Sequence, residues 1–256
     1  HYGDRCITVV AQDRDGIDRA LRQFVTTPGT YTRYAARVHA ILQMAKDDGM
    51  IPEVPKLREW KTPRKKPMQY LKDKSKLDEL LAHLAEHQRP MVLFAVYTGL
   101  RQSNVLNLTW ERVDMPRKLL WVSADEAKAG KNISIPRNAQ AMEVLHGQYG
   151  QHPVYVFTYR GRAIKEIKTA FMAACVAAGL GQLTYTPNPH NKSGRSQHYS
   201  GLRWHDLRHT FASWHAMKGT PPQVIQMLGG WSSMRMVENY THLSPSFVAD
   251  HADNIT

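Results

Sequence analysis

Apolar residues along this chain recur mostly at every third or fourth position, the spacing of a helix with one buried face. Tyr34, Val38, Ile41 and Ala45 follow this spacing, and Gly49 stands where such a helix would end. Ser75, Asn138 and Thr220 are predicted N-caps of later helices. Together the signals predict helices over residues 13–27, 31–48, 75–86, 90–98, 103–108, 139–146, 163–178, 202–218, 221–228 and 233–243, and a last helix after residue 245.

Alternating or continuous apolar residues indicate strands in a smaller part of the chain. Residues 119–122 and 133–135 predict a β-hairpin with its tip at 127–131, and residues 154–157 predict a short strand. Residues 181–201 are rich in Gly, Pro, Asn and Ser and predict a long loop, which either follows DNA or is disordered; we favour a disordered loop. The fold class predicted is α+β, mostly helical, with a small antiparallel sheet.

Prolines suggest where the chain divides. Proline removes a helical hydrogen bond and favours an extended path. We therefore interpret residues 56–67 as a basic, proline-rich linker between a small helical domain, residues 1–55, and a larger domain, residues 68–256. Two short helices make a thin domain, and the chain starts without Met, so we expect the helical domain to be truncated. The linker cations are Lys61, Arg64, Lys65 and Lys66.

The charge of the chain narrows the class of partner. The 34 Lys and Arg against 22 Asp and Glu leave a formal net charge of +12. Such an excess favours a polyanion such as DNA or RNA, although a basic surface that is merely solvated fits it too. Two distant cysteines and no signal peptide predict a reducing cytoplasm, and no apolar run reaches the roughly 20 residues of a membrane span.

A phosphate site is one interpretation of the helix predicted over residues 202–218. His205 and Arg208, three residues apart, share a helix face that lies beside the apolar stripe of Leu207 and Phe211. Arginine offers a planar fork of donors, and histidine exchanges a proton near neutral pH. The alternative is a surface histidine beside a surface arginine.

Four further residues are candidates for a functional cleft, and each also has an ordinary structural explanation. Arg101 follows a buried helix and a Gly break, or else it caps the helix end. Lys128 lies at the predicted hairpin tip, as an ordinary turn lysine also would. Trp231 precedes the helix over 233–243 and Tyr240 lies late on it, where a core tryptophan and an amphipathic tyrosine are also expected.

Taken in order, four strings resemble the catalytic domain of the tyrosine recombinases, the phage integrase family. They are Thr98-Gly-Leu-Arg-Gln-Ser103, His205-Asp-Leu-Arg-His-Thr-Phe-Ala-Ser213, Leu228-Gly-Gly-Trp-Ser-Ser233 and Tyr240-Thr-His-Leu-Ser-Pro245. The resemblance covers residues 68–250, and residues 30–55 are similar to the end of the family's core-binding domain.

The resemblance implies a DNA cleaving and rejoining reaction without metal, ATP or other cofactor. Tyr240 matches the nucleophile that forms a 3′-phosphotyrosyl link. Arg101 and Arg208 match the pair that holds the non-bridging phosphate oxygens, and Lys128 matches the general acid for the leaving 5′-oxygen. His205 matches a residue that binds the phosphate or assists proton movement from the tyrosine.

Two positions depart from the family pattern. Trp231 stands where many members have histidine, and its indole N–H can only donate. Asn104 replaces the usual carboxylate, so it can hydrogen-bond but cannot neutralise a cation. The alternatives to a recombinase are a non-catalytic DNA-binding protein of the same fold and a type IB topoisomerase.

The resemblance also implies partners. These are double-stranded DNA carrying an attachment site and further copies of the chain, as a homotetramer on DNA and a monomer alone, in the nucleoid region of a bacterial cytoplasm. No membrane partner is expected. Candidate DNA contacts are Lys61, Arg64, Lys65, Lys66, Lys131 and Arg203.

Overall fold

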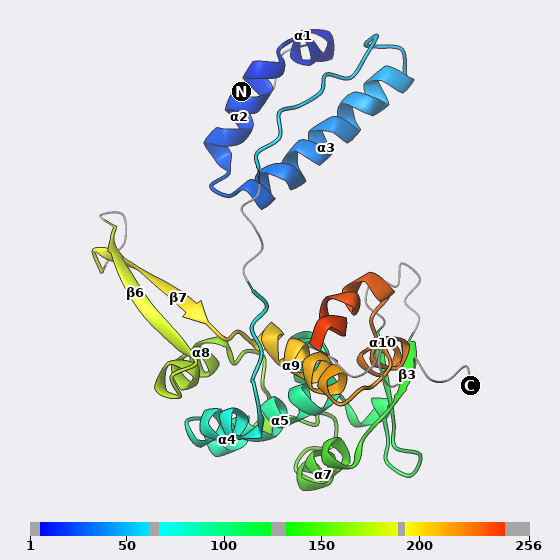
Figure 1. Ribbon diagram of the computed structural model, residues 1–256, viewed down its shortest axis with the longest axis vertical. Helices are drawn as coiled ribbons and strands as arrows, with labels where there is room; N and C mark the ends of the chain where they lie inside the picture. Colours follow the sequence, from blue (N-terminus) through cyan, green and yellow to red (C-terminus); the bar gives the residue numbers. More distant parts are fainter. Residues whose placement is uncertain (1–5, 62–66, 124–131, 189–192, 244–256) are drawn as a thin grey trace, which may run out of the picture. The chain divides into compact units, whose positions relative to one another are not determined.

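A computed structural model describes residues 6–61, 67–123, 132–188 and 193–243 (Figure 1). It divides into two compact units, unit 1 from residue 1 to 67 and unit 2 from residue 68 to 256. The helices of unit 1 are α1 (Ile7–Gln12), α2 (Arg14–Phe24) and α3 (Pro28–Asp47). Both helices predicted for this part are confirmed, and α1 is an additional one.

Local capping explains where these helices begin. The Asp13 side chain accepts a hydrogen bond from the Gly16 backbone N–H at 2.8 Å, which starts α2 directly after α1. Thr27 caps α3, and Pro28 stands at its first position, where a missing N–H leaves no hydrogen bond unmade.

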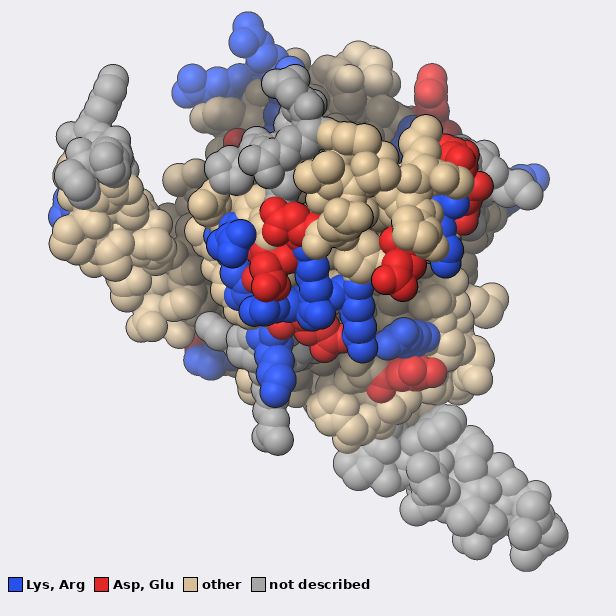
Figure 2. Space-filling view, turned by 90° about the horizontal axis from the view of Figure 1, so that it is seen from above, with Lys and Arg blue, Asp and Glu red and all other residues tan. Residues whose placement is uncertain are grey.

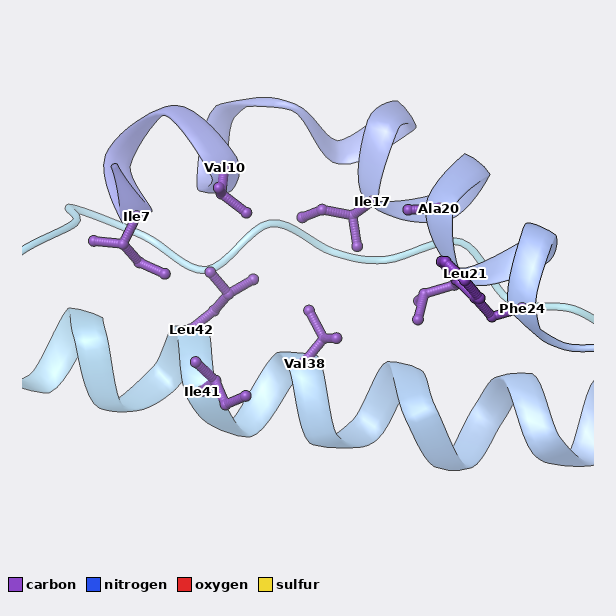
Figure 3. Close-up of a pocket in the computed structure, with 9 residues that line it drawn as sticks. All are labelled: Ile7, Val10, Ile17, Ala20, Leu21, Phe24, Val38, Ile41 and Leu42. Atoms are coloured by element: carbon purple, nitrogen blue, oxygen red, sulfur yellow. The ribbon is translucent and has the colours of Figure 1, made fainter. Parts of the chain in front are cut away.

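The core of unit 1 is small and leaves an apolar groove. Ile17, Leu42, Ala45 and Ile51 are buried. Side chains of α1 and α2 point across a space of about 320 Å³ towards those of α3 (Figure 3). The groove is lined by Ile7, Val10, Ile17, Ala20, Leu21, Phe24, Val38, Ile41 and Leu42.

The first half of the predicted linker packs on unit 1. The phenol of Tyr31 donates to Asp18 Oδ1 at 2.5 Å and lies 2.9 Å from the carbonyl oxygen of Arg58. Arg22 donates to the other Asp18 oxygen at 2.7 Å, and its guanidinium carbon lies 4.8 Å from the centroid of the Trp60 ring. Residues 56–61 therefore belong to the folded surface of unit 1.

Unit 2 is mostly helical with small antiparallel sheets, which confirms the predicted α+β class. Its α-helices are α4 (Lys74–Ala82), α5 (Arg89–Thr98), α6 (Gln102–Leu106), α7 (Ala139–Gln148), α8 (Lys168–Ala177), α9 (Trp204–Met217) and α10 (Pro222–Gly229). Its 3₁₀ helices are η1 (Glu86–Gln88), η2 (Trp110–Arg112), η3 (Met234–Met236) and η4 (Glu238–Leu243). Its strands are β1 (Val113–Asp114), β2 (Leu119–Ser123), β3 (Asn132–Pro136), β4 (Thr158–Tyr159), β5 (Arg162–Ala163), β6 (Gly181–Pro187) and β7 (Arg195–Gly201).

The main sheet of unit 2 has the order β1-β2-β3. The predicted hairpin is confirmed as β2 and β3, with the buried Leu120 opposite the buried Ile135. The predicted strand at 154–157 is wrong. Its backbone makes a single β-bridge between Tyr155 and Thr109, and Val156 N–H donates to Leu108 at 3.0 Å.

The predicted disordered loop at 181–201 is also wrong in the part that the structure describes. Strands β6 and β7 pair over seven residues each, with Leu183 opposite Tyr199, and the hairpin extends away from the helices of unit 2 (Figure 1). The alternating Leu183, Tyr185 and Tyr199 are the strand signal that the Gly, Pro, Asn and Ser content masked.

Helix ends in unit 2 differ from the predictions in a few places. Asn138 caps α7 as predicted, accepting from Ala141 N–H at 2.8 Å. Asp73 rather than Ser75 caps α4, and α10 begins after Pro221 without a side-chain cap. The helix predicted over 163–178 begins only at residue 168, and the one over 233–243 is replaced by η3 and η4.

Helix α9 lies at the centre of the contacts that shape the site. It packs against α5, α10 and η4. Its Thr210 hydroxyl accepts from Leu71 N–H at 3.0 Å, and its Trp214 indole donates to the Leu71 carbonyl at 2.8 Å. The segment that precedes α4 is thus fastened to the helix that carries His205 and Arg208.

Candidate active site

The orientation of α9 decides where its polar side chains go. Arg203 N–H donates to Asp206 Oδ2 at 2.7 Å, a capping contact that fixes the first turn. Leu207 and Phe211 are buried in the interior of unit 2. His205, on the first turn, is exposed, whereas Arg208, one turn later, faces inward.

Arg208 is buried, with 3% of its surface exposed. Its Nη1 donates to the carbonyl oxygens of Gly99 at 2.6 Å and Gly229 at 2.7 Å. The expectation that His205 and Arg208 project together is therefore wrong in this state. Two backbone carbonyls, one after α5 and one at the end of α10, hold the guanidinium instead, so one charged group joins three separate segments of unit 2.

Both glycines that hold Arg208 leave no room for a side chain. Gly99 has φ +65°, and a Cβ there would lie 2.5 Å from Cδ1 of Phe211. A Cβ on Gly229 would lie 1.7 Å from Cζ3 of Trp231, whose ring sits 4.0 Å from the guanidinium carbon of Arg208. The Gly residues of the two motifs therefore give Arg208 its carbonyl acceptors and its aromatic neighbour.

Tyr240 lies on η4 and packs into the same cluster. Only 2% of its surface is exposed, and its ring lies 6.3 Å from that of Trp231. Its phenol oxygen is 2.5 Å from Nδ1 of His209, the residue that follows Arg208 on α9. The structure therefore brings together Arg208, Trp231 and Tyr240, three of the residues predicted from the sequence.

Sequence reasoning missed His209 as a member of this cluster. It stood inside the quoted His205–Ser213 string but received no role. The available signal was its spacing, because residues four apart share a helix face and His205 already marked that face. The two imidazoles meet edge to face with centroids 5.1 Å apart.

Burial sets the protonation of the Tyr240 and His209 pair. Burial raises the pKa of Tyr240 to about 12, while the nearby positive charge of Arg208 opposes the rise. Burial lowers the pKa of His209 to about 4, assisted by the positive charges of His205 and Arg208. At neutral pH the pair is thus a protonated phenol beside a neutral imidazole, which has one nitrogen able to accept a proton.

The remaining predicted catalytic residues are Arg101 and Lys128. Arg101 is half-buried at the start of α6, two residues after the Gly99 carbonyl that binds Arg208, and Asn104 is half-buried one turn later. Lys128 lies outside the described residues. The strand that follows it, β3, packs beside α10, the helix that ends at Gly229.

The predicted DNA contacts are described only in part. Lys61 and Arg203 are exposed, whereas Arg64, Lys65, Lys66 and Lys131 lie outside the described residues. On the face drawn in Figure 2, Lys and Arg side chains gather near the centre with Asp and Glu side chains among them. The charge of that face is mixed rather than uniformly positive.

Two other kinds of site are not found in the described part of the chain. It contains no group of three or more His, Cys, Asp or Glu side chains arranged to hold a metal ion. Within the same residues, no helix combines the length and apolar character needed to cross a bilayer.

Comparison with known proteins bears on the cluster directly. The family model described as the phage integrase family matches residues 71–246, a span that includes Arg101, Arg208, Trp231 and Tyr240. The chain belongs to the phage integrase family. This confirms the family that the four sequence strings indicated, and it places every predicted catalytic residue inside the shared region.

Relatives in this family differ in length from the chain. The integrase of Salmonella phage P22 is 32% identical over 223 residues, which is 77% of this chain and 52% of that protein. Tyrosine recombinase XerA of Pyrococcus furiosus is 25% identical over 213 residues, 81% of this chain and 68% of that protein. The chain spans about half the length of the P22 integrase.

Solved structures of phage integrase relatives share the fold at low identity. The Tn1549 transposon integrase in complex with a circular intermediate DNA has a TM-score of 0.69 at 14% identity and covers 96% of this chain and 85% of that one. XerH site-specific recombinase bound to its difH substrate has a TM-score of 0.61 at 16% identity, covering 95% and 71%. The likeness extends over both units.

Proposed function

We propose that this protein is a site-specific DNA recombinase of the integrase type, which cuts and rejoins strands through a 3′-phosphotyrosyl intermediate. The observation that carries the proposal is that Tyr240 and Arg208 both lie against Trp231, which brings a phenol nucleophile and a guanidinium for the phosphate into one cluster. Family membership and relatives called integrase or recombinase support it.

The proposed chemistry needs no external energy source. The Tyr240 oxygen attacks a DNA phosphodiester, and the bond from phosphorus to the 5′-oxygen breaks as the phosphotyrosyl bond forms. Arg101 and Arg208 stabilise charge on the non-bridging oxygens, Lys128 protonates the leaving oxygen, and Trp231 supports the guanidinium. His205, exposed on the first turn of α9, binds the phosphate.

Tyr240 has to become accessible to the DNA phosphate when the chain binds the duplex. Tyr240 and Arg208 are both almost fully buried in the chain alone, so the scissile phosphate cannot reach either group without movement. Tyr240 sits on a short 3₁₀ helix, which has poorer hydrogen-bond geometry than an α-helix. We infer that the pair of Tyr240 and His209 becomes accessible when the duplex binds, with the contact between η4 and α9 kept.

The proposed partner is double-stranded DNA with an attachment site, bound by a homotetramer. Solved relatives with this fold are bound to a circular intermediate DNA or to a difH substrate. The net charge of +12 fits such a partner, and Lys61 and Arg203 are the exposed cations available to its backbone among the described candidates.

A nicked suicide substrate tests the proposal. The full chain should form a covalent protein–DNA adduct, Tyr240→Phe should form none, and Tyr149→Phe, which alters a tyrosine that is 70% exposed, should behave as the unaltered chain. Binding without adduct would indicate a DNA-binding protein. Relaxation of supercoils without strand exchange between two duplexes would indicate a topoisomerase.

A further inference from the structure

The contact between His209 and Tyr240 is a polar interaction of the proposed nucleophile that has no role in the chemistry described above. The Tyr240 oxygen lies 2.5 Å from Nδ1 of His209, and the two rings are 5.9 Å apart and tilted by 43°. A separation this short is a hydrogen bond, and the phenol is its donor in the tautomer that carries the ring proton on Nε2.

We propose that His209 is a catalytic residue, which accepts the phenol proton of Tyr240 as the tyrosine oxygen attacks the DNA phosphate. The proposal rests on the proposed recombinase function and assigns a role that His205 was expected to share. His205 is exposed and lies one helical turn away, whereas His209 already touches the reacting atom.

The surroundings of His209 keep its ring neutral in the resting protein. The imidazole is half-buried between α9 and η4, and the positive charges of His205 and Arg208 disfavour its protonation by solvent. Ionisable groups on the helices packed against α9 are Arg89 and Tyr97 of α5 and Glu238, Tyr240 and His242 of η4, and α10 has none. In the resting protein the neutral ring therefore has one nitrogen without a proton.

The proposed step balances in both directions. In cleavage, the O–H bond of Tyr240 breaks, its proton moves to Nδ1 of His209, and the oxygen bonds to phosphorus as the 5′-oxygen leaves with a proton from the general acid. In rejoining, the 5′-hydroxyl returns its proton to the general acid as its oxygen attacks phosphorus, and the departing Tyr240 oxygen takes its proton back from the imidazolium.

A conservative variant separates proton transfer from simple positioning. In His209→Asn the amide places a polar atom near the position of Nδ1, so a hydrogen bond to Tyr240 survives while the basic nitrogen is lost. The matched control is His146→Asn, which alters an exposed histidine on α7. Thermal unfolding of the three proteins shows whether each is folded before rates are compared.

Single-turnover adduct formation on the suicide substrate is then followed from pH 6 to 9. We expect His209→Asn to be slower by at least about 100-fold at pH 7, with a rate that rises about tenfold per pH unit as hydroxide replaces the lost base. The unaltered chain and His146→Asn should show a shallower dependence. A His209→Asn rate near that of the unaltered chain, or a slow rate with an unchanged pH profile, would overturn the proposal.

A measurement without DNA keeps this test separate from the proposed function. Nitrogen-15 spectra of the free chain, with His209 assigned by its absence from His209→Asn, show which ring nitrogen carries the proton. An unprotonated Nδ1 supports the proposal, and a protonated Nδ1 overturns it. If the unaltered chain forms no adduct, the recombinase proposal fails, while the spectra still decide whether His209 accepts from Tyr240.

Discussion

The guanidinium carbon of Arg208 lies 4.0 Å from the centroid of the Trp231 ring. The ring occupies the space that a Cβ on Gly229 would need, and the Gly229 carbonyl accepts a hydrogen bond from the same guanidinium. Trp231 thus acts on the site through packing, whatever its indole N–H does on DNA.

Gly229→Ala should damage the cluster by overpacking. The added methyl group would lie 1.7 Å from Cζ3 of Trp231, so the ring has to move away from Arg208. We expect a loss of about 1–3 kcal/mol in the free energy of unfolding. Urea unfolding measures it, and Gly147→Ala is the control, since nothing lies within 4 Å of a Cβ on that helical glycine. Equal stability of the two variants would contradict the packing argument.

Arg208→Ala should separate cleavage from binding. We expect adduct formation to be nearly abolished, while salt-sensitive DNA affinity measured by fluorescence anisotropy stays largely intact. The loss of Nη1 also leaves the carbonyls of Gly99 and Gly229 without this donor, which should lower stability by about 1–3 kcal/mol. Arg117→Ala, at an exposed arginine with a weak ion pair to Asp114, is the control for both measurements.

Acid should destabilise unit 2 partly through His209. Its pKa is about 4 in the folded chain and near the ordinary value of 6.5 when unfolded, so between these values the unfolded state binds more protons. Stability therefore rises with pH from about 4 to 6.5 and falls as the solution is acidified. Unfolding curves of the unaltered chain and His209→Asn at pH 7 and pH 5 measure the effect. The variant should lose less on acidification, and an equal loss would argue against a buried, neutral His209.

Tyr31→Phe should weaken unit 1 without touching the candidate site. Burial alone would raise the pKa of Asp18, yet the hydrogen bonds from Arg22 and Tyr31 lower it, so the carboxylate depends on these donors. Removing the Tyr31 hydroxyl should reduce stability by about 1–3 kcal/mol. Tyr34→Phe, on the exposed face of the same helix, should change it by less than about 0.5 kcal/mol. Proteolysis of unit 1 under native conditions reports the difference.

The sequence predicted most helices because their apolar spacing and caps are local signals. Asn138 illustrates this, since its side chain caps α7 as expected. The hairpin of β6 and β7 was missed because its strand signal is spread over residues also common in loops. The helix predicted over 233–243 failed because packing of Val237 and Tyr240 into the core is satisfied by 3₁₀ turns.

The sequence predicted which residues form much of the candidate site, but it did not predict how they are arranged in space. Arg208 and Tyr240 could be found by their strings, whereas the inward direction of Arg208 depends on carbonyls from Gly99 and Gly229, which are distant in sequence. The spacing of His205 and His209 indicates a shared face of α9, but it does not indicate that Tyr240 of η4 packs against His209. Three-dimensional contacts between separate segments therefore supply what the local patterns lack.

The attachment of Leu71 to α9 has a mechanical consequence. Its N–H and C=O are both bonded to this helix, at Thr210 and Trp214. Thr210 directly follows His209 and lies two residues beyond Arg208. A force applied to the chain at residue 71 is therefore transmitted through these two hydrogen bonds to α9, the helix that carries Arg208 and His209 of the candidate site.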